Sequence, residues 1–269
     1  TQGTIRRVRF IEGVLRPAGT PRSSSANGVL PVPRRLIGEA PVEEDGSFNV
    51  EVPAQTPILV QTLDQYGLAL GTSDWIWVQP KETRGCIGCH EDPELTPENE
   101  YVKALRRPSN KLVLPPDKRR SIVFREEVAP IVQARCASSE CHGNSSNPLF
   151  LPLSAGRSAA SDLEQAYRAL TAPESDGSTK SDTPGQSHGK YIDPGSARTS
   201  WIAWQLLGTN TTRPWDLSPQ KDTRPQKKIS KMPPPGKGSP LSPEELYTIL
   251  QWIDLGAAFT MPDELPTKK

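Results

Sequence analysis

Histidine, cysteine, methionine and aromatic residues are all scarce in this chain. Its 269 residues include 3 His, 4 Cys and 2 Met, and aromatic residues make up 6%. No apolar stretch reaches roughly 18 residues, so the sequence predicts no membrane-spanning helix. A net charge of +1 provides no overall field that would favour nucleic acid or an anionic membrane. The sequence also lacks a Ser-His-Asp order, a phosphate-binding loop and a dinucleotide-binding glycine motif.

All four cysteines fall in two short runs that each end in Cys-His. The first run, Cys86-Ile87-Gly88-Cys89-His90, has the C-x-x-C-H spacing that is typical of c-type haem attachment. Two thiols one short turn apart can form thioethers with one porphyrin edge, and the adjacent imidazole can bind the iron. The second run, 136–142, has four residues between its cysteines. We therefore predict two covalent c-type haems. The predicted anchors are Cys86, Cys89, Cys136 and Cys141, and the predicted proximal iron ligands are His90 and His142.

Two other uses of cysteine pairs fit these runs less well. A structural zinc site takes Cys and His ligands, but adjacent Cys and His residues are awkward joint ligands for one tetrahedral ion. A disulfide within either run would close a very small loop. Pairing between the runs would leave both histidines unexplained. The wide spacing of the second run is a rarer haem form, known among multihaem cytochromes.

Few side chains remain to serve as the opposite iron ligands. Met232 lies in a proline-flanked loop, and its thioether is a soft ligand that usually raises the potential of a haem. We predict that Met232 caps the second haem, although a methionine can also fill a gap in a core. His188 is the one histidine outside the two runs. It could cap the first haem, cap the second, ligate a haem in a neighbouring subunit, or be a solvated loop residue.

Residues 1–80 are predicted to form a small β domain. Alternating apolar and polar residues indicate half-buried strands, separated by Pro-rich and Gly-rich turns. The alternating apolar positions are Val8 and Phe10; Phe48, Val50 and Val52; Ile58 and Val60; and Trp75 and Trp77. Short strands of this kind favour a small antiparallel sandwich. We expect a first haem-binding segment, residues 81–120, to pack against that domain.

Residues 121–269 are predicted to be mainly helical. Pro130 suits the first turn of a helix that leads into Cys136. Ser242 and Glu245 form a capping box at the start of a C-terminal helix, which Gly256 ends. Two further helices are predicted, one capped by Ser161 and Glu164 and one over 199–207. The whole chain is thus predicted to be α+β and loop-rich, with 20 Gly and 29 Pro.

The second region resembles a class I cytochrome c domain. In that family a helix runs into the haem-binding Cys-His segment, a loop methionine binds the opposite side of the iron, and a C-terminal helix crosses the first. The order of the helix before Cys136, the Met232 loop and the 242–256 helix matches that pattern. The resemblance implies a cytochrome c-like fold for 121–269 and supports Met232 as an iron ligand.

A wider resemblance covers most of the chain. It rests on 37–48, 52–54, 63–67, 84–91, 193–200, 214–216 and 252–257. These stretches are similar to planctomycete-type cytochromes, and to the haem-bearing portion of the hydrazine synthase alpha-subunit family. Members of the latter family have a catalytic haem that is open to small nitrogen substrates, with a tyrosine ligand shortly after the haem histidine. The resemblance implies a similar haem at the first run. Residues 91–95 here contain no tyrosine, and Tyr101 lies farther on.

The main functional prediction is an exported dihaem cytochrome that transfers electrons to and from redox partner proteins. Covalent haem attachment normally takes place outside the cytoplasm, so we expect a periplasmic or extracellular protein whose signal peptide has been removed. One alternative is a small-molecule haem redox enzyme, hydrazine synthase-like or peroxidase-like, with an open first haem. A second is a subunit of an extracellular filament of stacked haems. Basic runs such as 118–120 could steer an acidic partner, although such runs are usually solvated surface.

Overall fold

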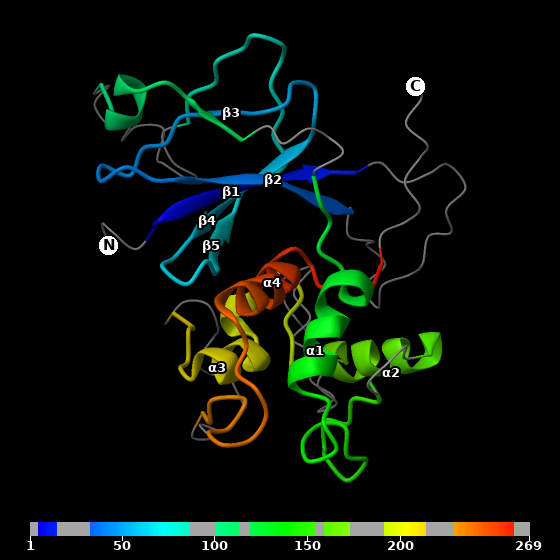
Figure 1. The fold of residues 1–269 in the computed structure, drawn as a ribbon. Coiled ribbons are helices and arrows are strands. Elements are labelled where there is room, and N and C mark those ends of the chain that lie inside the picture. Colours follow the sequence, from blue (N-terminus) through cyan, green and yellow to red (C-terminus); the bar gives the residue numbers. More distant parts are fainter. Residues whose placement is uncertain are drawn as a thin grey trace, which may run out of the picture. The chain divides into compact units, whose positions relative to one another are not determined.

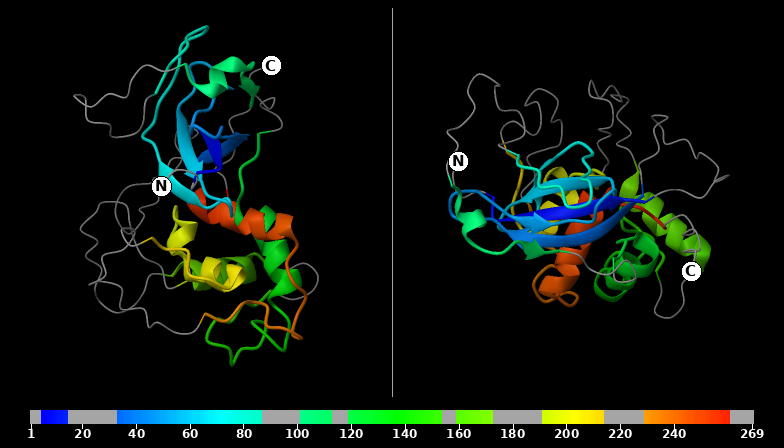
Figure 2. Two further views of the ribbon diagram at one scale, coloured as in Figure 1. Left: turned by 90° about the vertical axis from the view of Figure 1, so that its left-hand side faces the viewer. Right: turned by 90° about the horizontal axis from the view of Figure 1, so that it is seen from above.

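The computed structural model of the chain describes residues 5–14, 33–86, 101–112, 119–153, 159–172, 191–213 and 229–260. The chain divides into two compact units (Figures 1 and 2). Unit 1 comprises Thr1–Leu15 and Val32–Ser121, and unit 2 comprises Arg16–Pro31 and Ile122–Lys269. The predicted α+β class is confirmed, because an antiparallel sheet lies in unit 1 and the helices α1 to α4 lie in unit 2.

Unit 1 is built on a four-stranded antiparallel sheet with strand order β2-β1-β4-β5. The strands are β1 (Arg7–Gly13), β2 (Arg34–Pro41), β4 (Ile58–Leu63) and β5 (Ala69–Thr72). The strands predicted around Val8 and Ile58 are confirmed as β1 and β4. Neither β2 nor β5 was predicted, and in β2 the apolar alternation is interrupted by charged residues.

Ion pairs explain why the sheet tolerates charged residues. Arg9 of β1 is fully buried, and its guanidinium donates to Glu39 at 2.8 Å, to Gln61 at 3.0 Å and to the carbonyl of Gly67 at 3.2 Å. Glu12, also buried, pairs with Arg35 of β2 at 2.7 Å. Buried charges are tolerated where they are paired and hydrogen-bonded, so these residues form strands without the usual period-2 pattern.

An apolar core covers one face of the sheet. Its buried residues are Val8, Phe10, Ile37, Ala40, Ile58 and Leu112. Val50 and Val52 pack against this core, and the short strand β3 (Val50–Glu51) pairs in parallel with β6 (Asn110–Lys111). In place of the predicted sandwich, the described residues thus form one antiparallel sheet and a two-residue parallel ladder.

In place of the strand predicted from Trp75 and Trp77, the structure has one bridge residue between them. Ile76 forms an isolated bridge with Ile58 and packs, partly buried, against the core. Trp75 is half-buried and Trp77 is exposed. The tryptophan alternation thus indicated the right segment, although Ile76 rather than Trp77 packs against the core.

Unit 2 contains the predicted helices. They are α1 (Ala129–Arg135), α2 (Ala160–Thr171), α3 (Trp201–Leu207) and α4 (Pro243–Asp254). A π-helical segment, Phe124–Val128, leads into α1. The capping box of α4 is present, and Gly256 follows the helix with a φ of +105°. In α2, Asp162 rather than Glu164 accepts the capping bond, from the Ala159 N–H at 3.2 Å, because the helix begins one residue before Ser161.

An aromatic cluster fixes the start of the α1 segment against α4. The rings of Phe124 and Trp252 lie 5.6 Å apart, and those of Phe124 and Tyr167 lie 5.5 Å apart. The Tyr167 hydroxyl donates to the carbonyl of Ala257 at 2.9 Å. The Phe124 N–H donates to the carbonyl of Ala258 at 2.9 Å. These contacts join α1, α2 and α4 in one core and so position the far end of α1, from which the second Cys-His run emerges (Figures 1 and 2).

Candidate haem-binding site

The two Cys-His runs differ in how much of each the structure describes. Cys86 is exposed and its thiol is free. Cys89, His90 and His188 lie outside the described residues. Haem attachment at the first run therefore stays a prediction. The same holds for each ligand role of His188. The second run is described in full.

The second run forms a closed loop at the end of α1. Cys136 ends the helix, with its N–H donating to the carbonyl of Val132 at 2.8 Å. After four spacer residues the chain returns, and the His142 N–H donates to the carbonyl of Cys136 at 3.1 Å. The Cys141 N–H donates to the carbonyl of Ser138 at 2.9 Å. The backbone thus brings the second cysteine and the histidine back to the helix end despite the wide spacing.

Gly143, directly after the histidine, allows this loop to close. A Cβ atom at this position would lie 2.3 Å from the carbonyl oxygen of Ala137 and 2.8 Å from that of Ser138. Both neighbours are backbone atoms, which cannot move aside without opening the loop. The Gly143 N–H also donates to the Ser138 carbonyl at 2.9 Å. Gly143 was not predicted as a site residue, although it directly follows a Cys-His pair in the sequence.

The His142 ring is oriented by a backbone carbonyl. Its Nδ1 lies 2.9 Å from the carbonyl oxygen of Leu149. A carbonyl oxygen can only accept, so Nδ1 bears a proton, and Nε2 is the ring nitrogen left to bind a metal. Metal-binding histidines usually donate their second ring N–H in this way, which fixes the tautomer and the ring orientation. The Leu151 N–H donates to the carbonyl of His142 at 2.7 Å, which ties the same segment back to the run.

The Cys136 thiol is held in its neutral form. Burial, followed by the nearby Cys141 and Glu245 side chains, raises the pKa of Cys136 to about 11. A thiol with this pKa is a poor nucleophile at neutral pH, which disfavours a redox-active thiolate. A thioether has no charge to bury, so it suits this half-buried position.

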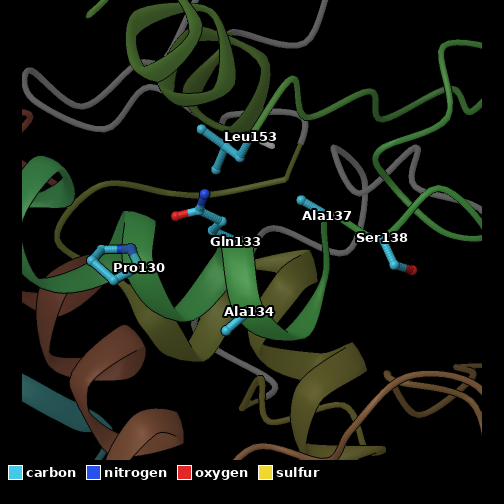
Figure 3. A pocket seen from close by; sticks show the side chains of 6 residues that line it. All are labelled: Pro130, Gln133, Ala134, Ala137, Ser138 and Leu153. Atoms are coloured by element: carbon cyan, nitrogen blue, oxygen red, sulfur yellow. The ribbon is translucent and has the colours of Figure 1, made fainter. Parts of the chain in front are cut away.

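A hollow of about 410 Å³ lies beside α1 and the first spacer residues. Its lining residues are Pro130, Gln133, Ala134, Ala137, Ser138 and Leu153. Figure 3 shows the Gln133 side chain extending from α1 toward Leu153. The lining is mostly small and apolar, as is typical of sites for flat organic groups. The lining includes Ala137 and Ser138 of the second run, but not Cys136, Cys141 or His142. The two thiols and the His142 ring, which follow on the same loop, are the donor set that a c-type haem takes.

The loop of residues 229–241, which we call the Met232 loop, adjoins the same helix end. The Met232 N–H donates to the carbonyl of Gln205 in α3 at 2.8 Å. Gly238 packs so closely on α1 that a Cβ there would lie 3.4 Å from the carbonyl oxygen of Arg135. The loop therefore spans from the end of α3 to the residue that precedes Cys136. The role of Met232 as iron ligand stays a prediction.

Within the described ranges, no three His, Cys, Asp or Glu side chains gather in a way that would hold a metal ion. This finding does not bear on a haem, whose porphyrin supplies four of the iron ligands. A haem iron needs one protein ligand, and a second on the opposite side only where that side is closed.

Comparisons with known proteins relate the chain to one enzyme. Residues 3–91, which end just past the first Cys-His run, match the family model for the hydrazine synthase alpha subunit middle domain. Hydrazine synthase subunit alpha of Kuenenia stuttgartiensis is 26% identical over 342 positions, which cover 99% of this chain and 39% of that protein. A solved structure of Kuenenia stuttgartiensis hydrazine synthase has a TM-score of 0.69 and 25% identity, and covers 96% of this chain and 39% of the solved one.

The chain is thus related to the hydrazine synthase alpha subunit and spans about two fifths of the length of that relative. The wider resemblance predicted from the sequence is confirmed. Because the alignment runs over 342 positions and this chain has 269 residues, the relative has insertions that this chain lacks. The resemblance of unit 2 to class I cytochromes c is not tested by these matches.

Proposed function

We propose that this chain is the haem-bearing part of a small-molecule redox enzyme of the hydrazine synthase type, with two covalent c-type haems. One observation carries this proposal. The relation to the alpha subunit extends over 99% of the chain, so both Cys-His runs lie inside it. This relation supports the enzyme alternative more than the electron carrier that the sequence alone favoured.

The geometry of the second run supports its part in this proposal. A c-type haem, when bound, supplies a one-electron iron couple. His142 would bind the iron through Nε2, because Nδ1 is engaged by the carbonyl of Leu149. Cys136 and Cys141 would anchor one porphyrin edge, and the hollow beside α1 would take part of the ring. Met232 would bind the opposite side of the iron.

The packing of unit 2 supports a cytochrome c-like arrangement around this haem. The helical segment that leads into Cys136 packs on the C-terminal helix α4 through Phe124 and Trp252, whose rings lie 5.6 Å apart. The Met232 loop directly precedes α4. The class I resemblance implies three parts: a first helix before the anchors, a methionine loop, and a last helix that packs on the first.

We assign the reaction centre to the first haem, with Cys86 and Cys89 as anchors and His90 as proximal ligand. A haem enzyme of this kind needs an open position on its iron, and the contacts of Tyr101 support the proposal that this residue is not the ligand. The Tyr101 side chain is exposed, and its hydroxyl donates to the carbonyl of Leu105 at 3.0 Å. Among described residues Tyr101 is the first tyrosine after the run. His188 is the competing ligand, and capping by it would close the site.

A dihaem electron carrier is the second candidate function. The Met232 loop favours it, since a His/Met haem is suited to electron transfer without ligand exchange. The filament alternative requires self-assembly, which particle size in dilute solution would reveal. All three candidates share the same predicted anchors.

We further propose that the protein works in the periplasm or outside the cell, where covalent haem attachment takes place. Redox proteins or other subunits are its expected partners. The related Kuenenia protein is called a subunit, which supports a role within a complex. In the part of the chain that the structure describes, no helix has both the length and the apolarity to cross a membrane.

The visible spectrum of the reduced protein, with and without carbon monoxide, tests this proposal. Intact mass should first show two covalent haems. If the first haem is open and the second closed, about half of the Soret intensity should shift on carbon monoxide addition. No shift would favour the electron carrier, and a mass without haem would contradict both candidates.

A further inference from the structure

One ion pair links the end of α1 to the start of α4. The guanidinium of Arg135, the last residue of α1, donates through Nε to both carboxylate oxygens of Glu245, at 3.1 and 3.0 Å. Its Nη2 also donates to one of them at 2.9 Å. The two side chains are 30% and 23% exposed, so water screens the pair only in part. A bidentate pair of this kind fixes orientation as well as distance.

The same carboxylate closes the Met232 loop. Glu245 accepts a bond from the Ser242 N–H at 2.7 Å, and the Ser242 hydroxyl accepts one from the Glu245 N–H at 3.2 Å. Ser242 is the residue that follows the loop. Glu245 therefore holds the last residue before α4 with one set of bonds and the end of α1 with another.

Two further points of the loop lie beside helices. The Met232 N–H donates to the Gln205 carbonyl at 2.8 Å, which holds Met232 beside α3. A Cβ atom at Gly238 would lie 3.4 Å from the carbonyl oxygen of Arg135, so the loop backbone passes close to that residue. Arg135 thus contacts the loop through its own backbone and, through Glu245, the residue where the loop ends. The next residue in the chain is Cys136.

We propose that the Arg135–Glu245 ion pair is a latch that holds the Met232 loop over the second haem site and sets how firmly Met232 caps the iron. The inference rests on the proposed function, because it assumes a haem at Cys136 and Cys141. With the latch closed, the second haem excludes external ligands and only transfers electrons. With the latch weakened, the loop moves away more often and the iron becomes accessible. Arg135 and Glu245 are positioning residues that act through the loop.

The variant Glu245→Gln tests the latch in the full-length haem-loaded protein. The amide keeps the size of the side chain and an oxygen for the Ser242 N–H, but it removes the charge that binds Arg135. Two readouts are measured: hydrogen exchange of the amides in 229–241, and carbon monoxide binding by the reduced second haem. We expect both to increase about tenfold, given the strength of a partly buried charged pair.

The matched control is Glu164→Gln, which breaks the Arg168–Glu164 pair of α2. Nη2 of Arg168 lies 3.2 Å from Oε2 of Glu164, the two side chains are 78% and 55% exposed, and neither residue belongs to the loop. The control variant should leave both readouts unchanged. Arg135→Lys keeps the positive charge but loses the two-pronged guanidinium contact with the carboxylate, so both readouts should increase less than in Glu245→Gln. If Glu245→Gln does not fold, Arg135→Lys replaces it.

Two outcomes would overturn the latch. One is loop exchange equal to that of wild type in both latch variants. The other is faster exchange without any gain in carbon monoxide binding, which would show that the loop does not control the iron. Failure of the proposed function is distinguished separately in the wild-type protein, where it would appear as a missing haem in the intact mass or as a first haem that does not bind carbon monoxide.

Discussion

The two Cys-His runs present opposite kinds of evidence. The first has the common two-residue spacing, so five consecutive residues are enough to predict a haem site. Of those five, only Cys86 lies in the described part of the chain. The second has an unusual four-residue spacing, and its support comes from three-dimensional geometry. The Cys141 N–H closes a turn onto Ser138, and the His142 N–H bonds to Cys136 at the helix end. A common motif can thus be recognised without structure, whereas a rare one needs the fold to show how it closes.

The difference also suggests different roles. The second run lies at the end of α1 and is followed by a closed loop. The first run is preceded, from residue 77 to Cys86, by backbone that is neither helix nor strand. In our proposal the second haem transfers electrons and the first is the reaction centre. The predictions below separate the two sites.

The largest effect should follow from removing both anchors of the second site. Replacing Cys136 and Cys141 by Ala should leave one covalent haem, since no thioether can form there. Intact mass measures this directly, and the matched double variant of Cys86 and Cys89 should also leave one. A second-site variant that keeps two covalent haems would disprove the assignment of these anchors.

The next largest effect should follow from Gly143→Ala. The added Cβ would meet the carbonyl oxygen of Ala137 at 2.3 Å, so the loop must open. We expect a loss of about 1–3 kcal/mol in the unfolding free energy, and reduced haem incorporation at the second site only. Chemical denaturation and intact mass measure the two effects.

Gly85→Ala is the control for that substitution. Gly85 precedes the first run, and an added Cβ there would meet no atom within 4 Å. It should be neutral in stability and in haem content. Equal effects from both glycine variants would contradict the role assigned to the closed loop.

Substituting Met232 should have a moderate effect that is confined to the second haem. Met232→Ala should lower the potential of that haem and allow carbon monoxide to bind it, because a soft axial thioether is lost. Redox titration followed by visible spectra measures both. Met261, the other methionine, is the matched control, and a response to Met261→Ala instead would move the ligand role to that residue.

The smallest effect should be a pH dependence in unit 1. The hydroxyl of Ser47 at 2.6 Å and the N–H of Lys103 at 2.7 Å lower the pKa of Asp45 to about 2. Because the folded pKa lies below the unfolded value of roughly 3.9, this carboxylate stabilises unit 1 above that pH and loses its effect as the pH falls toward about 2. The variant Asp45→Asn should melt at a lower temperature than wild type at neutral pH, and the difference should shrink in acid. A constant difference from neutral pH to about 2 would contradict this assignment.

Local signals predicted much of the helical unit and less of the sheet. The capping residue Ser242, the terminating glycines and Pro130 each specify a helix end by short-range chemistry, so α1, α3 and α4 were predicted close to their observed bounds. Strand β2 was missed because Arg35 and Glu39 are stabilised by partners on β1, far away in sequence.

The candidate site shows the same division. The Cys and His residues were visible as a motif. The carbonyl of Leu149 that orients His142, and the pairing of Arg135 with Glu245, depend on how the loops fold back, and no spacing rule indicates them. Tertiary contacts therefore supply what orients the site, and the sequence supplies the reactive groups.

Carbon monoxide binding by the two single-haem proteins tests the central claim most directly. One protein lacks Cys136 and Cys141 and keeps the first haem, and the other lacks Cys86 and Cys89 and keeps the second. The account predicts that the reduced first haem binds carbon monoxide and shifts its Soret band, while the second does not. A first haem that ignores carbon monoxide would contradict the account and return the protein to the class of electron carriers.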